Sequence, residues 1–413
     1  MIFDNSTLLK TIFRLKRNFA QGTSPQKKIF SGIEIAPFKN NAAAAVCISA
    51  DFEMSWAWRR NNEEAHVPRG MAERQNVPII LRLLEEYFVP ITWATVGHLF
   101  LENCSRSASG LAHATMPRPT ANDRWCGDWY MHDPCSDFRK APLWYAPDLI
   151  QQILECKTPQ EIGTHSFSHI NFSARCSTPD LVRRELEACV DAMRPFGLQP
   201  RSLVFPFNVS EYSYLPLFAE TGIRSVRHRD HTVRLSYPER TESGVYRIYE
   251  SMNLRTSKRY DYATKAKMFI DKAMERRAAY SLWFHPSDSI EVFEREFRHI
   301  LQYMDSERSK GRLWITTMSD LAGYCEAREQ LHLSVERHQN ELDLSFRNSL
   351  DTSIYGTPEV SLIIRGFSAP KSTQLAMNNG ERRPIGVRVL KTDGEDQLIV
   401  NVPTAAKSLR LTF

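Results

Sequence analysis

Two histidines and two carboxylates have the residue types and spacing of a reactive centre. His165 and His169 lie four residues apart after a short strand-like run, a spacing that can bring two imidazoles onto one side of a turn. Asp51 and Glu53 follow an apolar run, and residues two apart on a strand project to the same side. One carboxylate could bind a metal with the histidines while the other acts as a base. Such a site keeps coordination positions open, as catalytic metal sites do.

Each half of this pattern also has an ordinary explanation. A histidine pair at this spacing is more often two unrelated side chains than a metal site. An Asp-x-Glu after a strand is usually loop chemistry or a helix cap. Both motifs, however, follow predicted strands in a chain of alternating strands and helices, where such folds place their active sites. Their joint placement favours a catalytic centre.

Strands and helices alternate along most of the chain, which predicts a parallel sheet or barrel beneath these residues. The strand candidates are residues 43–48, 90–96, 161–164, 202–205, 222–226, 245–248, 280–284 and 313–316. The helix candidates are residues 74–87, 147–155, 179–193, 214–220, 262–277 and 290–306. The stretch 103–143 is long for a connection, so we expect a functional loop or lid there.

After Cys325 the pattern changes to short alternating runs separated by turn residues. This is typical of a small all-β domain of sandwich type. We therefore expect three parts. Residues 1–40 form an N-terminal segment and linker, residues 41–326 a barrel, and residues 330–413 a β domain.

The composition is that of an ordinary globular protein, with 413 residues, 42% of them hydrophobic and 24% charged. The net charge of +5 is small for this length and no zinc-finger or RNA-binding spacing is visible, so no nucleic-acid partner is expected. The eight cysteines form no Cys-x-x-Cys and are scattered as in a reduced protein. With no secretory signal and no run of transmembrane length, the sequence predicts a cytoplasmic protein.

The N-terminus carries a basic amphipathic pattern. Leu8, Ile12, Leu15 and Phe19 recur at helical spacing among lysines and arginines. Such a helix could lie on an anionic membrane, which would place the protein at the inner membrane face. The alternative is a docking arm on the protein itself.

Two further motifs end predicted strands and complete a resemblance. With Asp-x-Glu at 51–53 and His-Ser-x-x-His at 165–169, the Phe-Pro at 205–206 and the Leu-Trp-Phe-His at 282–285 resemble the polysaccharide deacetylase family (carbohydrate esterase family 4, the NodB-homology domain). Residues 89–97 are similar to the family's second strand. The resemblance covers about residues 42–325. It implies a distorted (β/α)7 barrel with a divalent metal, followed here by the small all-β domain.

The resemblance also implies roles for individual residues. Asp51 corresponds to the catalytic base, and Glu53, His165 and His169 to the metal ligands. His285 corresponds to the histidine that protonates the leaving group. The residues implied at the substrate groove are Trp93, Phe205, Pro206, Phe207, Asn208 and Trp283. Other aromatic residues that could line an open, sugar-binding cleft are Trp125, Trp129, Tyr130, Trp144 and Tyr145.

Two departures from the family pattern bear on the substrate. The usual first motif has adjacent aspartates, whereas Asp51-x-Glu53 resembles a divergent branch with atypical peptidoglycan deacetylases and allantoinase-like amidohydrolases. The third motif usually carries an arginine that supports the base, and no arginine occupies that position here. Arg227 and Arg229 are candidates to replace it from another strand end.

These observations predict a hydrolase of non-peptide carbon–nitrogen bonds that depends on a divalent metal, zinc first and cobalt, manganese, iron or nickel as alternatives. The expected reaction is N-deacetylation of an amino sugar in a polysaccharide or glycan precursor. The alternatives are an allantoinase- or imidase-like hydrolase of cyclic amides and a non-catalytic, sugar-binding barrel.

Overall fold

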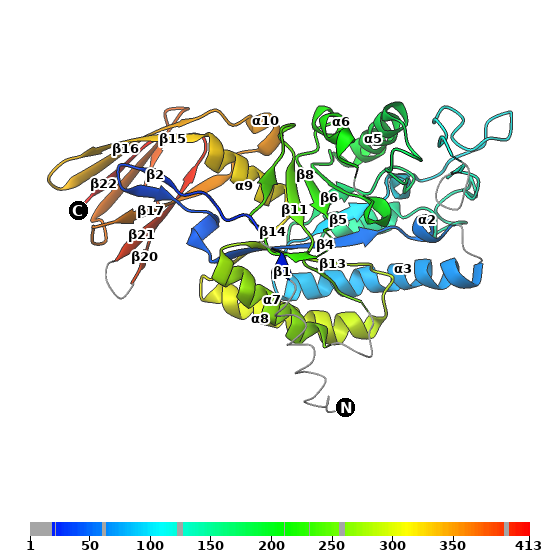
Figure 1. Cartoon of the computed structure of the whole chain (residues 1–413), viewed down its shortest axis with the longest axis horizontal. Coiled ribbons are helices and arrows are strands. Elements are labelled where there is room, and N and C mark those ends of the chain that lie inside the picture. Colours follow the sequence, from blue (N-terminus) through cyan, green and yellow to red (C-terminus); the bar gives the residue numbers. More distant parts are fainter. Residues whose placement is uncertain are drawn as a thin grey trace.

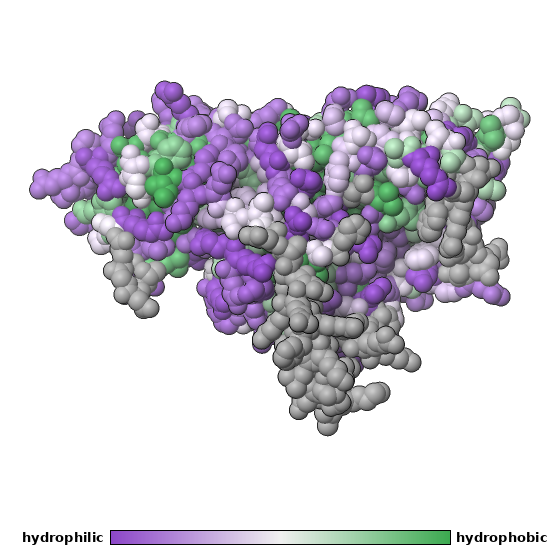
Figure 2. All heavy atoms as spheres, viewed as in Figure 1, coloured by the Kyte–Doolittle hydropathy of each residue, from purple (hydrophilic) through white to green (hydrophobic). Residues whose placement is uncertain are grey.

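The structure is a computed structural model, and it describes residues 19–20, 22–59, 63–121, 127–209, 211–230, 232–255, 261–391 and 396–413. An α/β unit lies beside an all-β unit, so the molecule is elongated (Figure 1). The face shown in Figure 2 is dominated by hydrophilic side chains, with small hydrophobic patches over both units. Within the described ranges, no helix is both long and apolar enough to cross a membrane.

The described strands of the α/β unit form one ten-stranded sheet in the order β10-β11-β8-β7-β6-β5-β4-β13-β12, with β14 also paired to β4. Neighbours are parallel except β10 and β11. The strands are β4 (Ala44–Phe52), β5 (Thr92–Thr95), β6 (Glu161–Thr164), β7 (Ser202–Val204), β8 (Ser225–His228), β10 (Glu239–Arg240), β11 (Tyr246–Tyr249), β12 (Met252–Asn253), β13 (Ala279–Phe284) and β14 (Leu313–Thr316). The sheet curls far enough for Arg227 of β8 to contact Asp51 of β4.

Helices connect the strands and cover the sheet (Figure 1). The longer ones are α3 (Glu63–Glu86), α4 (Pro147–Leu154), α5 (Pro179–Met193), α6 (Leu215–Glu220), α7 (Tyr262–Arg276), α8 (Arg298–Ser309) and α9 (Met318–Gln330). The short ones are α2 (Ser55–Trp58), α10 (Thr352–Tyr355), η1 (Lys39–Asn41), η2 (Gly97–Phe100), η3 (Arg194–Phe196), η4 (Pro206–Asn208), η5 (Tyr212–Tyr214) and the π-helical η6 (Val292–Phe297).

The alternation of side chains along β4 separates two environments. Val46 and Ile48 face the helices and join the largest hydrophobic cluster, which includes residues of α3, α7 and α8. Cys47 faces the barrel interior, where it joins a cluster closed at one end by Met318 and Leu321 of α9. Asp51 continues this inward-facing row at the opposite end. The barrel is therefore apolar where α9 covers it and polar at the carboxyl ends of its strands.

The all-β unit consists of two five-stranded sheets that enclose a second core. One sheet contains β15 (Leu331–Arg337), β16 (Glu341–Asn348), β18 (Ser372–Met377), β19 (Arg382–Arg383) and β22 (Ala406–Thr412). The other contains β2 (Lys28–Phe30), β3 (Ile33–Ile35), β17 (Glu359–Arg365), β20 (Val387–Leu390) and β21 (Gln397–Pro403). A further two-stranded pair joins β1 (Phe19–Ala20) to β9 (Val233–Arg234).

The predicted α/β class with an added all-β region is confirmed. Residues 28–35, which the sequence assigned to an N-terminal segment and linker, form β2 and β3, and β3 pairs with β17. The N-terminal helix predicted around Leu8 falls mainly outside the described residues. The domain boundaries predicted from the sequence stay a prediction.

Two local expectations differ from the structure. The helix predicted over residues 74–87 begins earlier, at Glu63, and runs through Pro68 and Pro78. Proline costs about 3 kcal/mol inside a helix, and here the packing of α3 against the barrel core outweighs that cost. The cysteines were expected to be reduced throughout. Cys176 is instead disulfide-bonded.

Candidate metal centre

The predicted ligands meet at the carboxyl ends of the central strands. Glu53 directly follows β4, His165 follows β6 and His285 follows β13. The Oε1 atom of Glu53 lies 2.9 Å from Nε2 of His165 and 3.2 Å from Nε2 of His169. Nε2 of His285 lies 3.9 Å from the other Glu53 oxygen. The structure thus brings together four side chains that come from three separate stretches of sequence.

The protonation pattern of this cluster fits a bound cation. Nδ1 of His165 lies 2.8 Å from the carbonyl oxygen of Val204, so Nδ1 carries the proton and donates it. With the ring proton on Nδ1, Nε2 is the atom that can present a lone pair toward the Glu53 carboxylate, as a metal ligand does. Two lone pairs 2.9 Å apart repel each other unless a cation lies between them. A hydrogen bond from a ring Nδ1 to a carbonyl is also the usual support for a metal-binding histidine.

Burial strengthens the electrostatics of the centre. Glu53, His165 and His169 are each at most 4% exposed. Burial alone would raise the pKa of Glu53, but His169, His285 and His165 outweigh it and hold that pKa well below its usual range. Burial lowers the pKa of His169 to about 4, against the opposing effect of Glu53. A carboxylate beside a neutral imidazole is the protonation state that binds a divalent metal.

The turns that carry the ligands are strained. Met54, Ser166, His169 and Phe207 all have positive φ values, between 52° and 59°. Such conformations cost of order 1–3 kcal/mol each in a residue other than glycine. They cluster on the loops after β4, β6 and β7, which surround the centre. Part of the backbone strain of the described chain is therefore held in the loops that carry the centre.

Glu73 of α3 holds the strained turn after β4, and nothing in its sequence context marked it. Its carboxylate accepts hydrogen bonds from the backbone N–H groups of Glu53, at 3.2 Å, and Met54, at 3.0 Å. The side chain is fully buried, and burial together with the Glu53 charge raises the pKa of Glu73 well above its usual value. Glu73 thus acts on the centre by positioning Glu53.

Arg227 supplies the cation that the third motif lacks. Its guanidinium donates to both oxygens of Asp51, at 2.5 and 2.6 Å, and to Oγ of Ser49 at 3.0 Å. The side chains of Arg227 and Asp51 are only 1% and 3% exposed. The guanidinium also lies over the ring of Trp283, 4.3 Å from its centroid. Arg229, the other candidate, lies beyond the end of β8 and pairs with Glu250 at 3.5 Å.

His285 stands at the open side of the centre. Its side chain is 26% exposed, whereas those of Glu53, His165 and His169 are nearly inaccessible. Its ring packs edge-on against Trp283, with centroids 5.3 Å apart. A group in this position can reach a substrate that approaches from solvent.

Only some of the predicted groove residues lie at the centre. The ring of Phe207 contacts that of His169, with centroids 4.6 Å apart, and Oδ1 of Asn208 accepts a hydrogen bond from Arg227 at 3.3 Å. Trp283 packs beneath Arg227. Trp93 and Phe205 are each at most 1% exposed and sit in hydrophobic clusters, and their contact with substrate stays a prediction. Pro206 is buried as well.

The aromatic residues between β5 and α4 do not form an open cleft. Trp129, Tyr130 and Tyr145 are each at most 1% exposed, whereas Trp144 is half-buried, and the role of these residues in binding a sugar stays a prediction. Trp125 falls outside the described residues. Sequence could not separate the two roles, because an aromatic residue that fills a core looks the same as one that lines a groove.

Comparison with known proteins identifies the fold. A Mycobacterium smegmatis protein described as a polysaccharide deacetylase aligns with 77% of this chain and 100% of its own length, at a TM-score of 0.50 and 14% identity. The chain has the fold of the polysaccharide deacetylases. An allantoinase and a Pseudomonas aeruginosa PAO1 protein described as a polysaccharide deacetylase each align with 70% of this chain and 92% of their own, at a TM-score of 0.48 and 13% identity. No protein-family model and no curated protein matches the sequence. The deacetylase-type barrel predicted from the motifs is confirmed as a fold.

Proposed function

We propose that this protein is a metal-dependent hydrolase that removes the acyl group, most simply acetyl, from an amino sugar in a polysaccharide or glycan precursor. The supporting observation is the cluster of Glu53, His165 and His169 beside the Arg227-bound Asp51, at the end of the barrel where such folds place active sites. His285 completes the set at the open side.

Glu53, His165 and His169 are the residues that would hold the metal, and zinc suits their mixed nitrogen and oxygen donors. When bound, such an ion polarises an amide carbonyl and lowers the pKa of water from about 16 toward about 7. Three protein ligands leave room for water and substrate, as in catalytic zinc sites.

Asp51 and His285 are the two groups that would move protons. Arg227 fixes both oxygens of Asp51, so the carboxylate is held in one orientation from which it accepts the proton of the attacking water. His285, exposed at the rim, donates a proton to the departing nitrogen, because an amine leaves readily only once it is protonated. Each such group typically contributes about 10²- to 10⁴-fold in rate.

The surroundings of His285 support a sugar as substrate. Trp58 and Phe207 are half-buried and flank the centre, the former with its ring centroid 6.5 Å from that of His285. Aromatic side chains beside a few polar groups suit the binding of a pyranose ring, and Phe207 is the better candidate because the guanidinium of Arg69 lies over the ring of Trp58, 3.8 Å from its centroid. Because Asp51-x-Glu53 also resembles the motif of allantoinase-like amidohydrolases, cyclic amides are the second substrate class to be tested.

Activity against a panel of N-acetylated amino sugars, their nucleotide-linked forms and cyclic imides tests the proposal. We expect acetate release that requires zinc or another divalent ion. Asp51→Asn and His285→Ala should keep the metal and lose about 10²- to 10⁴-fold in turnover. The exposed His338 of the β unit provides the control, because His338→Ala should change neither metal content nor rate.

The same measurements can refute the proposal. Full activity in His165→Ala, or a protein that binds no divalent ion at this centre, would show that the cluster is not a metal site. Turnover of cyclic imides alone would replace the sugar substrate and leave the hydrolase. Loss of metal in Asp51→Asn would make Asp51 a ligand.

A further inference from the structure

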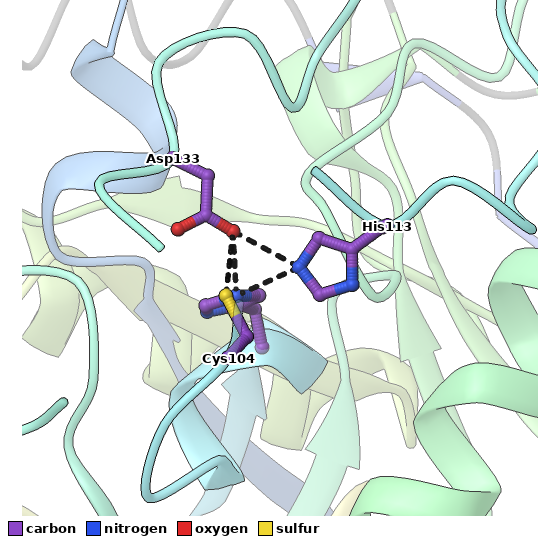
Figure 3. A group of neighbouring side chains, drawn as sticks. Cys104, His113 and Asp133 are labelled. Carbon is purple, nitrogen blue, oxygen red and sulfur yellow. Dashed lines mark hydrogen bonds and ion pairs between the residues drawn. The ribbon is translucent and has the colours of Figure 1, made fainter. Parts of the chain in front are cut away.

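We infer that His98, Cys104, His113 and Asp133 form a second metal site, which binds zinc in a structural role. His98 lies in η2, immediately after β5, and the other three lie in the connection between η2 and α4. The candidate ligand atoms all lie within 4.8 Å of one another. Figure 3 shows the side chains converging on one point from separate parts of this connection.

The distances among the ligand atoms are close to those of a tetrahedral site. Nε2 of His98 lies 3.2 Å from Nε2 of His113, and each of these atoms lies 2.9 Å from Oδ2 of Asp133. Sγ of Cys104 lies 3.4 Å from the same oxygen. Zinc bonds of about 2.0–2.3 Å place tetrahedral ligand atoms roughly 3.3–3.6 Å apart. An ion would therefore fit after an outward shift of a few tenths of an ångström.

The side chains of this cluster have too few protons to make every close contact to Asp133 a hydrogen bond. Nδ1 of His98 lies 3.3 Å from the carbonyl oxygen of Trp144 and donates to it, so Nε2 of the neutral ring presents a lone pair to Asp133. His113 and Cys104 can each donate one proton toward Asp133, but the contact between His98 and Asp133 still lacks one. A metal cation provides the missing positive charge.

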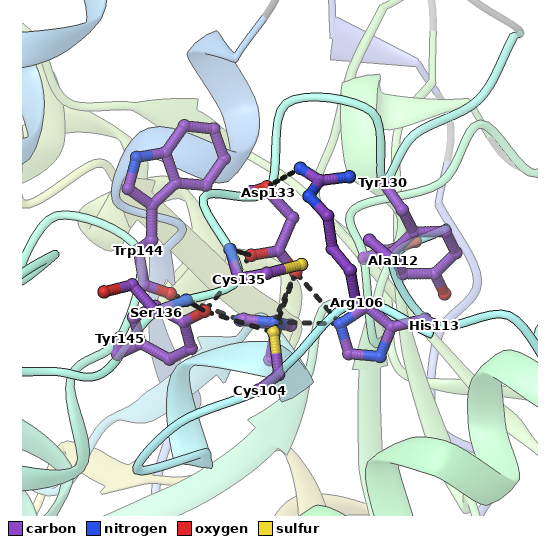
Figure 4. Close-up of polar contacts among 12 residues, drawn as sticks. Cys104, Arg106, Ala112, His113, Tyr130, Asp133, Cys135, Ser136, Trp144 and Tyr145 are labelled. Atoms are coloured by element: carbon purple, nitrogen blue, oxygen red, sulfur yellow. Dashed lines mark hydrogen bonds and ion pairs between the residues drawn. The ribbon is translucent and has the colours of Figure 1, made fainter. Parts of the chain in front are cut away.

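A shell of hydrogen bonds orients the ligands (Figure 4). The second oxygen of Asp133 accepts from the Tyr145 hydroxyl at 3.1 Å and from the backbone N–H of Cys135 at 2.8 Å. The Tyr145 hydroxyl also lies 3.2 Å from Sγ of Cys104. Metal ligands are characteristically held by such outer contacts, which fix their rotamers before the ion binds.

The ligand set indicates a structural ion. Four protein ligands fill a tetrahedral zinc site and leave no open position for water, unlike the three-ligand centre at Glu53. The ions suited to two imidazoles, a thiolate and a carboxylate are zinc and its close analogues. His98 and Asp133 are fully or almost fully buried, so the ion would be shielded from solvent.

The position of the site indicates which part of the fold the ion would stabilise. The connection between η2 and α4 contains isolated bridges and no helix or strand within its described residues. A metal that joins His98 to Asp133 would clamp this long segment onto the barrel. The backbone N–H of His98 also donates to the carbonyl oxygen of Phe167 at 2.9 Å, within the turn that carries His165 and His169. By fixing His98, the ion would also stabilise the turn that carries His165 and His169.

Metal analysis of the full-length protein, purified with a thiol reductant and zinc, tests the inference. We expect two zinc ions per chain in the wild type. The double variant His165→Ala/His169→Ala should retain only the ion of the second site, and Cys104→Ser should lose that ion and retain the one at the Glu53 centre. Cys135→Ser is the matched control, because Cys135 is adjacent to the cluster but outside the ligand set, and it should retain both ions.

Cobalt substitution gives a readout that does not depend on the stability of a variant. A cobalt ion bound by Cys104 shows a thiolate charge-transfer absorption, which the first centre cannot produce because it has no sulfur ligand. We expect this band in the wild type, in His165→Ala/His169→Ala and in Cys135→Ser. Absence of the band from the folded, cobalt-loaded wild type would overturn the inference.

Two other results would also overturn it. One is a band that persists unchanged in Cys104→Ser. The other is a folded, metal-free protein in which Cys104 and Cys135 are joined by a disulfide. Failure of the proposed function is distinguishable, because it would appear as a metal content that His165→Ala/His169→Ala does not change, with the cobalt–thiolate band intact.

Discussion

Replacing Arg227 by glutamine tests how the Asp51 carboxylate is held. The substitution removes both hydrogen bonds to Asp51 and leaves that carboxylate buried without its counter-charge. Removing one member of a buried ion pair typically costs about 3–5 kcal/mol, because the remaining charge has lost both water and partner. We therefore expect Arg227→Gln to lower the free energy of unfolding by about 3–5 kcal/mol.

The double variant Asp51→Asn/Arg227→Gln should lose less unfolding free energy than the sum of the losses in the two single variants. Both charges are then gone, and two amides can form a neutral hydrogen bond in the same space. The coupling energy should fall in the upper part of the range for contacting residues, roughly 2–3 kcal/mol. Turnover should behave in the same way, since Arg227 acts through Asp51 and its loss adds little once Asp51 is gone.

Urea unfolding of the chelator-treated protein, followed by near-ultraviolet circular dichroism, measures this cycle without the contribution of bound metal. Arg229→Gln is the matched control. Its ion pair with Glu250 is longer and its side chain is 58% exposed, so the change should stay below about 1 kcal/mol. Single-variant effects on stability that add to within 0.5 kcal/mol, as they do for independent sites, would refute the assigned pairing.

Three further perturbations probe the supports of the centre. Burial raises the pKa of Glu185, so the stability it provides at pH below 4.5 is lost as the pH rises toward that raised pKa. In urea titrations the advantage of wild type over Glu185→Gln should shrink as the pH rises, and an advantage that grows would contradict this. Glu187→Gln is the matched substitution on the same helix, at a side chain that is 43% exposed. Gly97→Ala places a Cβ 2.9 Å from a cysteine sulfur and should cost about 1–3 kcal/mol by overpacking, whereas Gly386→Ala meets no atom within 4 Å and should be neutral in calorimetry. A chain ending after residue 330 should aggregate on gel filtration because β3 loses its partner strand, and removing residues 22–35 as well should restore a monomer; identical behaviour of the two versions would argue against that pairing.

The clustering of the candidate metal ligands could be predicted because these residues follow the ends of strands. An apolar run followed directly by polar residues is readily recognised as a buried strand with a functional loop at its end. Glu53, His165 and His169 accordingly lie close together in the structure, as their spacing predicts. For the arginine that pairs with Asp51, the sequence left two candidates, Arg227 and Arg229. The choice between them depends on where β8 ends and which way it curls, because side chains alternate in and out along the strand.

Other residues gave no usable sequence signal. Trp93 belongs to a motif similar to the family's second strand, but the pleat turns its side chain into the helix-facing core. Glu73 lies inside a helix, where its role depends on a turn twenty residues away. The cluster around Asp133 has no compact spacing, since its ligands are spread over a long connection. Such contacts depend on tertiary packing between distant residues, and local sequence patterns do not predict that packing.

The pairing of β3 with β17 has a consequence for biosynthesis. Glu34 and Arg365, which form an ion pair between these strands, are 331 positions apart in the chain. At about 5–20 residues per second, translation would take roughly 15–65 s to supply the partner strand. Throughout that time the ribosome-bound chain carries an apolar hairpin with Ile33 and Ile35 uncovered, residues that are fully buried in the finished protein. Because β17 is synthesised after the strands of the barrel, the β unit can be completed only after the barrel strands have left the ribosome.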